Sequence, residues 1–335
     1  MHRRVTLLSI AALAAGSVLL PAGAAQAATA PAAAGPKPVA RTAADSKSEQ
    51  RAVQSYWTPQ KMEDAQPLTP PAPKTGGKYG PGSPGEPTRG IPFTAPPTDA
   101  TGQQAAQAGG GAPWTRDGAV TRTTGRVFFT YQGRNASCSG SAVTSANKSV
   151  VITAGHCVKM GGAFHTNWVF VPGYTAGQRP HGTWVATKLL TTSQWNARED
   201  INFDMAAAVV APLQGRTLTD AVGGQGVAFN QARRLQMHAF GYPAAAPYDG
   251  SKLIYCAGRT FDDFLLSRDH GLTCNMTGGS SGGPWFQNFT EASGLGTLNS
   301  VNSFKYNFAP NWMFGPYFGA EAQAVYNSAQ TTDAL

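Results

Sequence analysis

The feature that most constrains the fold is a series of short apolar segments in the second part of the chain. Each segment is four or five residues long, is apolar or β-branched, and is bounded by Gly, Pro, Asn or Ser. The segments are residues 127–131, 150–153, 168–171, 183–186 and 206–210. Many short strands at this spacing predict an all-β sandwich or barrel. Residues 112–335 are long enough for one large core or two small barrels, with a helix expected over residues 320–326.

The chain before this domain has a different composition. Residues 28–40 form an Ala- and Pro-rich tract without periodicity, and residues 67–111 alternate proline with glycine. Both stretches lack the apolar residues needed to bury a core, so we expect them to be disordered or extended. Residues 42–64 are expected to contain a helix. Residues 28–111 are interpreted as a pro-region and linker, with a permanent surface tether as the alternative.

Residues 1–27 have the organisation of a secretory signal peptide. A basic start precedes an apolar run over residues 5–20 and the small-residue site Ala25-Gln26-Ala27. A membrane anchor is the alternative, but the run is short for a span of about 20 residues. We expect this segment to be removed during export and the protein to be secreted into the extracellular space.

Export to an oxidising compartment affects the expected state of the four cysteines. An even number in an oxidising compartment favours two disulfides, formed among Cys138, Cys157, Cys256 and Cys274. They show no C-x-x-C spacing, no H-E-x-x-H motif occurs, and the six histidines are scattered. The sequence therefore predicts no metal site and no cofactor.

Charge argues against several classes of partner. The formal net charge is +8, but only 13% of the residues are charged and the basic residues are dispersed. No basic stripe with interleaved aromatic residues is present, so nucleic-acid binding is not expected. We expect a monomer that binds no membrane once the signal peptide is removed.

A glycine-rich segment at residues 277–284, Thr-Gly-Gly-Ser-Ser-Gly-Gly-Pro, is a candidate nucleophile loop. The glycines free the backbone and let a substrate carbonyl approach Ser281. The N–H groups of Gly279 and Ser281 are candidates for an oxyanion hole. Taken alone, such a run is more often an ordinary loop.

A serine hydroxyl needs an adjacent base and the base needs an orienting acid. His156 follows the apolar segment 150–153 and is the candidate base, although a lone histidine there is more often structural. Asp204 enters the apolar segment 206–210, where a carboxylate is costly unless it is paired. Asp200 is the rival, but it stands beside Arg198 and Glu199, where solvation is the simpler interpretation.

These three local sequences, in the order His, Asp, Ser, resemble the chymotrypsin-like serine proteases. The motifs are Thr-Ala-Gly-His-Cys at 153–157, Phe-Asp-Met-Ala at 203–206 and Gly-Ser-Ser-Gly-Gly-Pro at 279–284. The sequence Gly-Tyr-Pro at 241–243 is similar to the bacterial V8-type, glutamyl-endopeptidase-like branch. From about Val120 onward, the resemblance implies two six-stranded antiparallel β-barrels with the site in the cleft between them.

The resemblance also implies particular pairings around the site. It implies a Cys138–Cys157 bridge, which leaves Cys256–Cys274 as the second pair. It further implies that Ser303 donates a hydrogen bond to the acid.

The resemblance does not define which substrates the protein cleaves. Trypsin-like members have an aspartate six residues before the serine, where this chain has Asn275, so cleavage after Lys or Arg is not supported. V8-type members have a histidine on a late strand, and the matching residues 300–304 contain none. Glutamate specificity is therefore not supported either. Asn275, Thr277 and Asn302 are expected to line a polar pocket.

The sequence as a whole predicts a secreted serine endopeptidase that acts on protein or peptide substrates through an acyl-enzyme. The main alternative is a catalytically inactive protease-like binding module. An esterase of the α/β-hydrolase type is disfavoured because its order is Ser, acid, His. The pro-region is expected to aid folding or to block the cleft until the chain is cut between Arg89 and Trp114.

Overall fold

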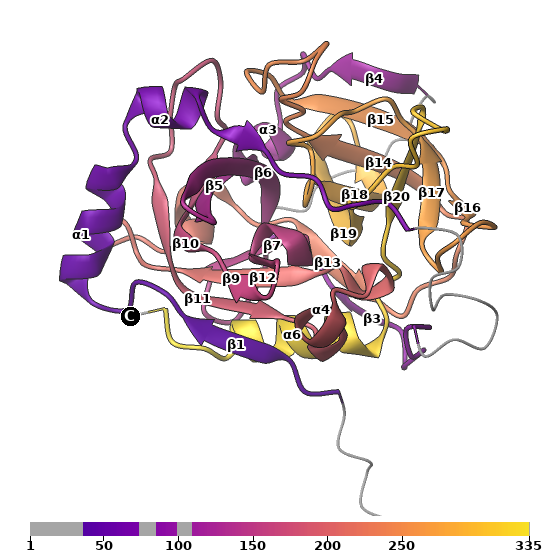
Figure 1. Ribbon diagram of the computed structural model, residues 1–335, viewed down its shortest axis with the longest axis horizontal. Helices are drawn as coiled ribbons and strands as arrows, with labels where there is room; N and C mark the ends of the chain where they lie inside the picture. Colours follow the sequence, from indigo (N-terminus) through magenta and orange to yellow (C-terminus); the bar gives the residue numbers. More distant parts are fainter. Residues whose placement is uncertain (1–35, 74–84, 99–108, 335) are drawn as a thin grey trace, which may run out of the picture. The chain divides into compact units, whose positions relative to one another are not determined.

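The computed structural model describes residues 36–73, 85–98 and 109–334 (Figure 1). The predicted signal peptide, the first part of the pro-region and part of the expected cleavage region lie outside these residues. Within the described ranges, no helix combines the length and apolar character needed to span a membrane.

Six antiparallel strands close into the first barrel (Figure 1). In ring order they are β5 (Thr124–Tyr131), β6 (Arg134–Val143), β7 (Val150–Thr153), β12 (Ala206–Val210), β11 (Trp184–Thr191) and β10 (Thr166–Pro172). All five apolar segments predicted as strands lie in this barrel, apart from one end residue, so that prediction is confirmed. β12 is buried along its whole length because α6 (Ala320–Gln330) packs against it.

The second barrel is built from the strands that follow. They are β14 (Gln236–Gly241), β15 (Ile254–Arg259), β17 (His270–Thr273), β18 (Pro284–Thr290), β19 (Leu295–Val301) and β20 (Trp312–Gly315). β19 pairs with β18, β18 with β14, β14 with β15, and β17 with β20. A bridge between Phe304 and Phe314 joins β20 to the chain leaving β19. The fold is thus all-β, with two six-stranded antiparallel barrels and the predicted C-terminal helix.

The remaining elements are short and connect or flank these strands. They are β8 (Lys159–Met160), β9 (Ala163–Phe164), β13 (Gly226–Phe229), β16 (Phe261–Asp262), α3 (Ala119–Thr123), α4 (Ser193–Arg198) and α5 (Leu218–Val222). Two single turns of 3-10 helix belong to the candidate site. Gly155–Cys157 carries the candidate base, and Ile201–Phe203 directly precedes the candidate acid.

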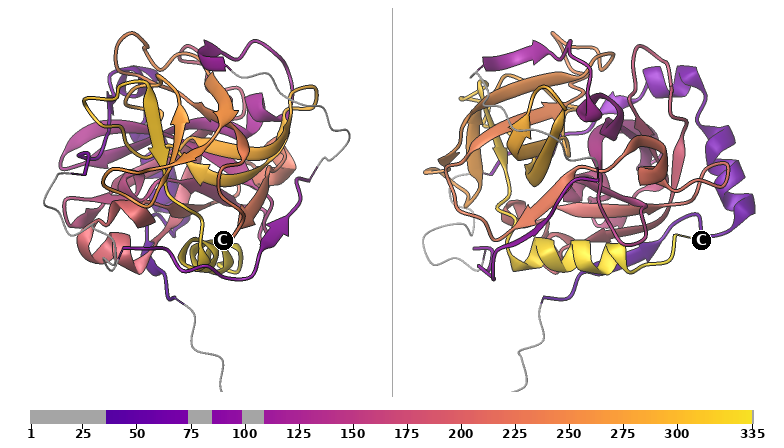
Figure 2. Two further views of the ribbon diagram at one scale, coloured as in Figure 1. Left: turned by 90° about the vertical axis from the view of Figure 1, so that its right-hand side faces the viewer. Right: turned by 180° about the vertical axis from the view of Figure 1, so that it is seen from behind.

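The N-terminal region packs on the first barrel (Figure 2). It contains β1 (Val39–Thr42), α1 (Lys47–Tyr56), α2 (Pro59–Glu63) and β2 (Gln66–Pro67). Ser46 and Glu49 form a capping box at the start of α1, which satisfies two free N–H groups of that helix. Trp57 is 1% exposed, packs against Phe128, and donates from Nε1 to the carbonyl of Asn167. The predicted helix within residues 42–64 is confirmed.

Residues 28–40 and 67–111 were expected to be disordered or to form an extended linker, and this is wrong where they form paired strands, at residues 39–40, 67, 93–95 and 109–111. β1 pairs antiparallel with β11, and β3 (Phe93–Ala95) pairs antiparallel with β13. β4 (Gly109–Pro113) pairs antiparallel with β15. These stretches do not build a core of their own. They use the edges and apolar surface of the barrels, which composition alone does not reveal.

Candidate active site

His156 and Asp204 meet because their strands are neighbours. β7 ends at Thr153, which pairs with Ala206 at the start of β12. Residues just after β7 therefore face residues just before β12. His156 Nδ1 lies 2.8 Å from Asp204 Oδ2, and the His156 N–H donates to Oδ1 at 2.8 Å. Both side chains are fully buried. This geometry favours the tautomer with its proton on Nδ1 and leaves Nε2 as the basic nitrogen.

The buried carboxylate of Asp204 has a further donor. Ser303, on the chain leaving β19, donates from Oγ to Oδ2 at 2.5 Å. The two oxygens therefore receive hydrogen bonds from a ring N–H, a backbone N–H and a hydroxyl. A buried carboxylate with this many donors has its polar atoms satisfied and is fixed in orientation.

His165 supports the loop from the other side. Its Nε2 lies 2.8 Å from the carbonyl oxygen of His156, and its ring stacks on Phe129. Burial lowers the pKa of His165 to about 4, so the ring is neutral at physiological pH and donates to that carbonyl. The sequence analysis did not identify this residue, although it follows His156 by nine positions.

Ser281 lies in the tight turn that leads into β18. Gly279 has φ +95° and Gly282 has φ +77°, in the left-handed region that favours glycine. A Cβ at Gly282 would lie 2.5 Å from the carbonyl oxygen of Ser139, so this position also has no room for a side chain. Within the described chain, the N–H groups of Gly279 and Ser281 donate no hydrogen bond. They are available to a developing oxyanion.

The N-terminal region covers this serine. Ser281 Oγ donates to the carbonyl oxygen of Leu68 at 3.2 Å, and the N–H of Leu68 donates to Ser137 O at 3.0 Å. β2, directly before Leu68, pairs with β6 in parallel. His156 Nε2 is buried and has no hydrogen-bond partner among the residues the structure describes.

Asn302 fixes the nucleophile turn rather than lining a pocket. Its Oδ1 accepts from Trp285 Nε1 at 2.7 Å, and its Nδ2 donates to Phe240 O and Ser280 O at 2.8 and 3.0 Å. The side chain is fully buried, with both polar atoms satisfied. The expectation that Asn302 contributes to a polar substrate pocket is therefore wrong.

The other two predicted pocket residues make local contacts. Asn275 is exposed, and its Oδ1 accepts from the hydroxyl of Tyr248 at 2.8 Å. Thr277 is half-buried and donates from Oγ1 to Ala245 O at 2.6 Å. Their role in substrate binding stays a prediction.

Asp200, the rival acid, is buried rather than solvated. It is 1% exposed, accepts from Asn202 N and Nδ2, and forms an ion pair with Arg198 at 3.2 Å. It therefore caps the turn that carries Asp204, and it makes no hydrogen bond to His156. The expectation that Asp200 is a solvated surface carboxylate is wrong.

Both expected disulfides are present. Cys138 is bonded to Cys157, and Cys256 is bonded to Cys274. Cys138, His156 and Cys157 lie close enough together to suggest a metal ligand set, but the two sulfurs are bonded to each other. The first bridge instead ties the loop of the candidate base to β6.

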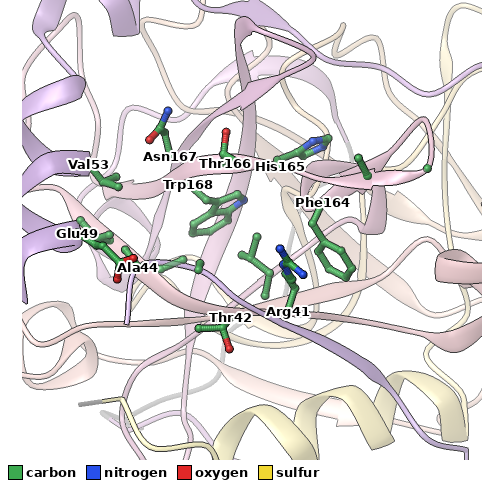
Figure 3. A pocket seen from close by; sticks show the side chains of 16 residues that line it. Arg41, Thr42, Ala44, Glu49, Val53, Phe164, His165, Thr166, Asn167 and Trp168 are labelled. Carbon is green, nitrogen blue, oxygen red and sulfur yellow. The ribbon is translucent and has the colours of Figure 1, made fainter. Parts of the chain in front are cut away.

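A pocket of about 540 Å³ lies between the N-terminal region and the first barrel (Figure 3). Arg41, Glu49 and Val53 line it from one side and His165 and Trp168 from the other. Its lining includes none of the three candidate catalytic residues, so the pocket is linked to the site only through His165.

The two barrels, with a buried histidine–carboxylate pair and a serine on a glycine turn, define the class of chymotrypsin-like serine proteases. Comparison with solved structures agrees with this class. The protease Anisep from Arthrobacter nicotinovorans is 45% identical, with a TM-score of 0.60, over 63% of this chain and 96% of that one. The thermostable serine protease AL20 from an extremophilic microorganism is also 45% identical, with a TM-score of 0.61, over 64% of this chain and 99% of that one.

The chain belongs to the chymotrypsin-like (trypsin-like) serine proteases. A Glu endopeptidase shares the fold, with 15% identity and a TM-score of 0.52, over 67% of this chain and 97% of that one. No family model and no curated protein matches the chain.

Proposed function

We propose that the protein is a secreted serine endopeptidase in which Ser281, His156 and Asp204 form the catalytic triad. The observation that carries this proposal is the 2.8 Å contact between His156 Nδ1 and Asp204 Oδ2. It lies in a protease fold whose serine turn holds two N–H groups that donate to none of the described residues. An inactive binding module is the alternative. It is disfavoured because every group that the reaction needs is present.

The reaction follows from these positions. Ser281 Oγ attacks the scissile carbonyl carbon while His156 Nε2 takes its proton, and Asp204 stabilises the imidazolium that forms. The N–H groups of Gly279 and Ser281 hold the oxyanion. His156 then protonates the leaving amine, which leaves an acyl-enzyme. Water, deprotonated by His156, hydrolyses the acyl-enzyme and restores Ser281 without a cofactor.

The endopeptidase assignment is supported by the segment that lies over Ser281. Leu68 faces the nucleophile in the middle of a continuous stretch that runs from Ala65 to Pro73. The site therefore accommodates polypeptide on both sides of the serine. Substrates are accordingly proposed to be internal segments of proteins or peptides, cleaved by a monomer.

The full chain is proposed to be a zymogen. Ser281 Oγ faces the oxygen of the Leu68 carbonyl, whereas attack needs access to a carbonyl carbon. The same contact uses the hydroxyl proton that His156 Nε2 would have to accept. Removal of the pro-region, by cleavage between Arg89 and Trp114, would free both groups. Secretion is supported by the signal-like N-terminus and by the two disulfides.

Paired serine variants test the assignment. Ser281→Ala is expected to abolish casein hydrolysis while the thermal unfolding midpoint stays near that of the wild type. Ser280→Ala is the matched control, because Ser280 Oγ donates only to Thr277 O at 2.8 Å. That variant is expected to retain hydrolysis. A purified Ser281→Ala protein that digests casein at the wild-type rate would show that the assignment is wrong.

A further inference from the structure

Lys305 lies beside the proposed nucleophile turn and has no acidic partner among the residues that the structure describes. It is half-buried, and its Nζ donates to the carbonyl oxygen of Met276 at 3.0 Å. No carboxylate in the described chain forms an ion pair with it. By contrast, the buried Lys159 lies 3.8 Å from a carboxylate oxygen of Glu199. A partly desolvated ammonium without a counter-ion is costly and is available to an external anion.

The position of Lys305 relates it to both halves of the site. It follows Ser303, which donates to Asp204, by two residues. Met276 precedes Ser281 by five residues. The Lys305 side chain therefore spans from the segment beside the acid to the segment that leads into the nucleophile turn.

The pro-region shows where a chain over Ser281 passes. Leu68 lies on the serine, and Thr69 Oγ1 is 2.7 Å from the position that a Cβ would take at Gly278. Further along, Ala72 packs against the cluster that contains Phe304 and Tyr306, the two neighbours of Lys305. A polypeptide bound across the nucleophile thus runs between the two segments that the Lys305 side chain connects.

We propose that Lys305 selects substrates with an acidic side chain at the residue whose carbonyl Ser281 attacks. This inference rests on the proposed function and names its substrate class. That carbonyl must lie between Ser281 Oγ and the N–H groups of the turn, which places the adjacent side chain next to residues 276–280 and 303–305. A carboxylate there would supply the counter-ion that the ammonium lacks.

The pro-region is consistent with this selection. Residues 65–73 contain no Asp or Glu, so the segment that covers Ser281 leaves Lys305 without a counter-ion. The missing histidine of the V8-type proteases therefore does not exclude acidic specificity, because a cation is supplied from another position.

The charge state of Lys305 gives a second readout. Burial lowers the pKa of Lys305 to about 8, and no charged group in the described residues contributes to that shift. The amine contacts the Met276 carbonyl, and the residues on either side of Met276, Asn275 and Thr277, are uncharged. Selection by charge must therefore weaken as the pH rises through 8.

The test uses the processed protein that an expressing culture secretes, with quenched fluorescent peptides that differ only in Glu, Gln, Ala, Phe or Arg at one position. Mass spectrometry confirms the cleaved bond. At pH 7 we expect kcat/KM for Glu to exceed that for Gln about tenfold or more, since hydrogen bonds to charged groups are worth this much. Above pH 8 the ratio should fall.

Variants assign the preference to the amine. Lys305→Met should bring the Glu-to-Gln ratio near one, and Lys305→Arg should retain the preference. The exposed Lys252→Met, as a matched control, should leave the ratio unchanged. A wild-type ratio near one, or a ratio that Lys305→Met retains, would overturn the inference while leaving the proposed function intact. Cleavage of none of the peptides, by a protein that also leaves casein uncut, would overturn the proposed function and the inference with it.

Discussion

Ser281 and Leu68 are joined by a hydrogen bond of 3.2 Å, from the candidate nucleophile to a backbone carbonyl of the N-terminal region. Leu68 is itself held in place by its N–H, which donates to Ser137 O on β6. On the Leu68 side both hydrogen bonds use main-chain atoms, so they do not depend on the leucine side chain. The serine hydroxyl faces the oxygen of this carbonyl, and this contact is the basis of the proposed zymogen.

This arrangement predicts that Leu68→Pro gives the unprocessed chain measurable proteolytic activity. Proline removes the N–H that donates to Ser137 O, which loosens the segment over Ser281. We expect several-fold faster casein hydrolysis by the intact precursor, whose mass is checked before and after the assay. Leu68→Ala keeps both backbone hydrogen bonds and should be as inactive as the wild-type precursor. Equal activity of the two variants would refute a main-chain block.

Replacing the two buried aspartates separates catalysis from stability. Asp204→Asn should lower kcat by about 10⁴-fold, because the amide no longer fixes the His156 tautomer or stabilises the imidazolium. Asp200→Asn loses the ion pair to Arg198 without touching His156. It should lower the thermal unfolding midpoint more than it lowers kcat. If Asp200→Asn inactivated the enzyme and Asp204→Asn did not, the acid would be misassigned.

The Cys138–Cys157 bridge is expected to stabilise the loop of the candidate base. The two cysteines are 19 residues apart, and closing a loop of that size contributes about 3 kcal/mol in the chain-entropy model. Replacing both cysteines with serine should lower the free energy of unfolding by roughly this amount, measured by urea denaturation in the Ser281→Ala background. An unchanged free energy of unfolding would contradict the expectation.

Acid should destabilise the protein partly through His165. Its pKa is lowered by burial from 6.5 to about 4. Between these pH values the unfolded chain binds a proton at His165 that the folded chain does not bind. The resulting stability is complete above pH 6.5 and is lost as the pH falls toward 4, by up to about 3 kcal/mol.

The matched variant for this effect is His165→Gln. Glutamine does not titrate and can still donate to the His156 carbonyl. Its free energy of unfolding, measured in urea between pH 4.5 and 6.5, should depend less on pH than that of the parent. Parallel pH profiles for the two proteins would assign the acid sensitivity elsewhere, for example to the buried His270, whose pKa is lowered to about 3.

The sequence predicted the elements whose signals are local. The five predicted strands of the first barrel are short apolar runs bounded by turn residues, and Gly279 and Gly282 of the serine turn occupy backbone angles that favour glycine. The meeting of His156 with Asp204 needed the family resemblance, since the pairing of β7 with β12 cannot be read from either segment alone. The two disulfides were assigned in the same way.

The incorrect expectations concern residues whose environment is set by distant parts of the chain. Composition marked residues 67–111 as unable to fold, but β3 is supported by β13, which lies far away in the sequence. Asn302 was predicted to line a pocket. Its hydrogen bonds to Trp285, Phe240 and Ser280 bury it instead, and these contacts cannot be predicted from the local sequence. Lys305 gave no signal in the sequence. What distinguishes it is that no carboxylate in the described part of the chain forms an ion pair with it.

The most direct test of the central claim is labelling with an organophosphorus fluoride, which reacts with an activated serine. The processed protein is expected to gain one adduct, located by peptide mass spectrometry on Ser281, and Ser281→Ala is expected to gain none. The unprocessed chain should react far more slowly because Leu68 covers the hydroxyl. A processed protein that hydrolyses casein but carries no adduct on Ser281, or carries it on another residue, would contradict the account.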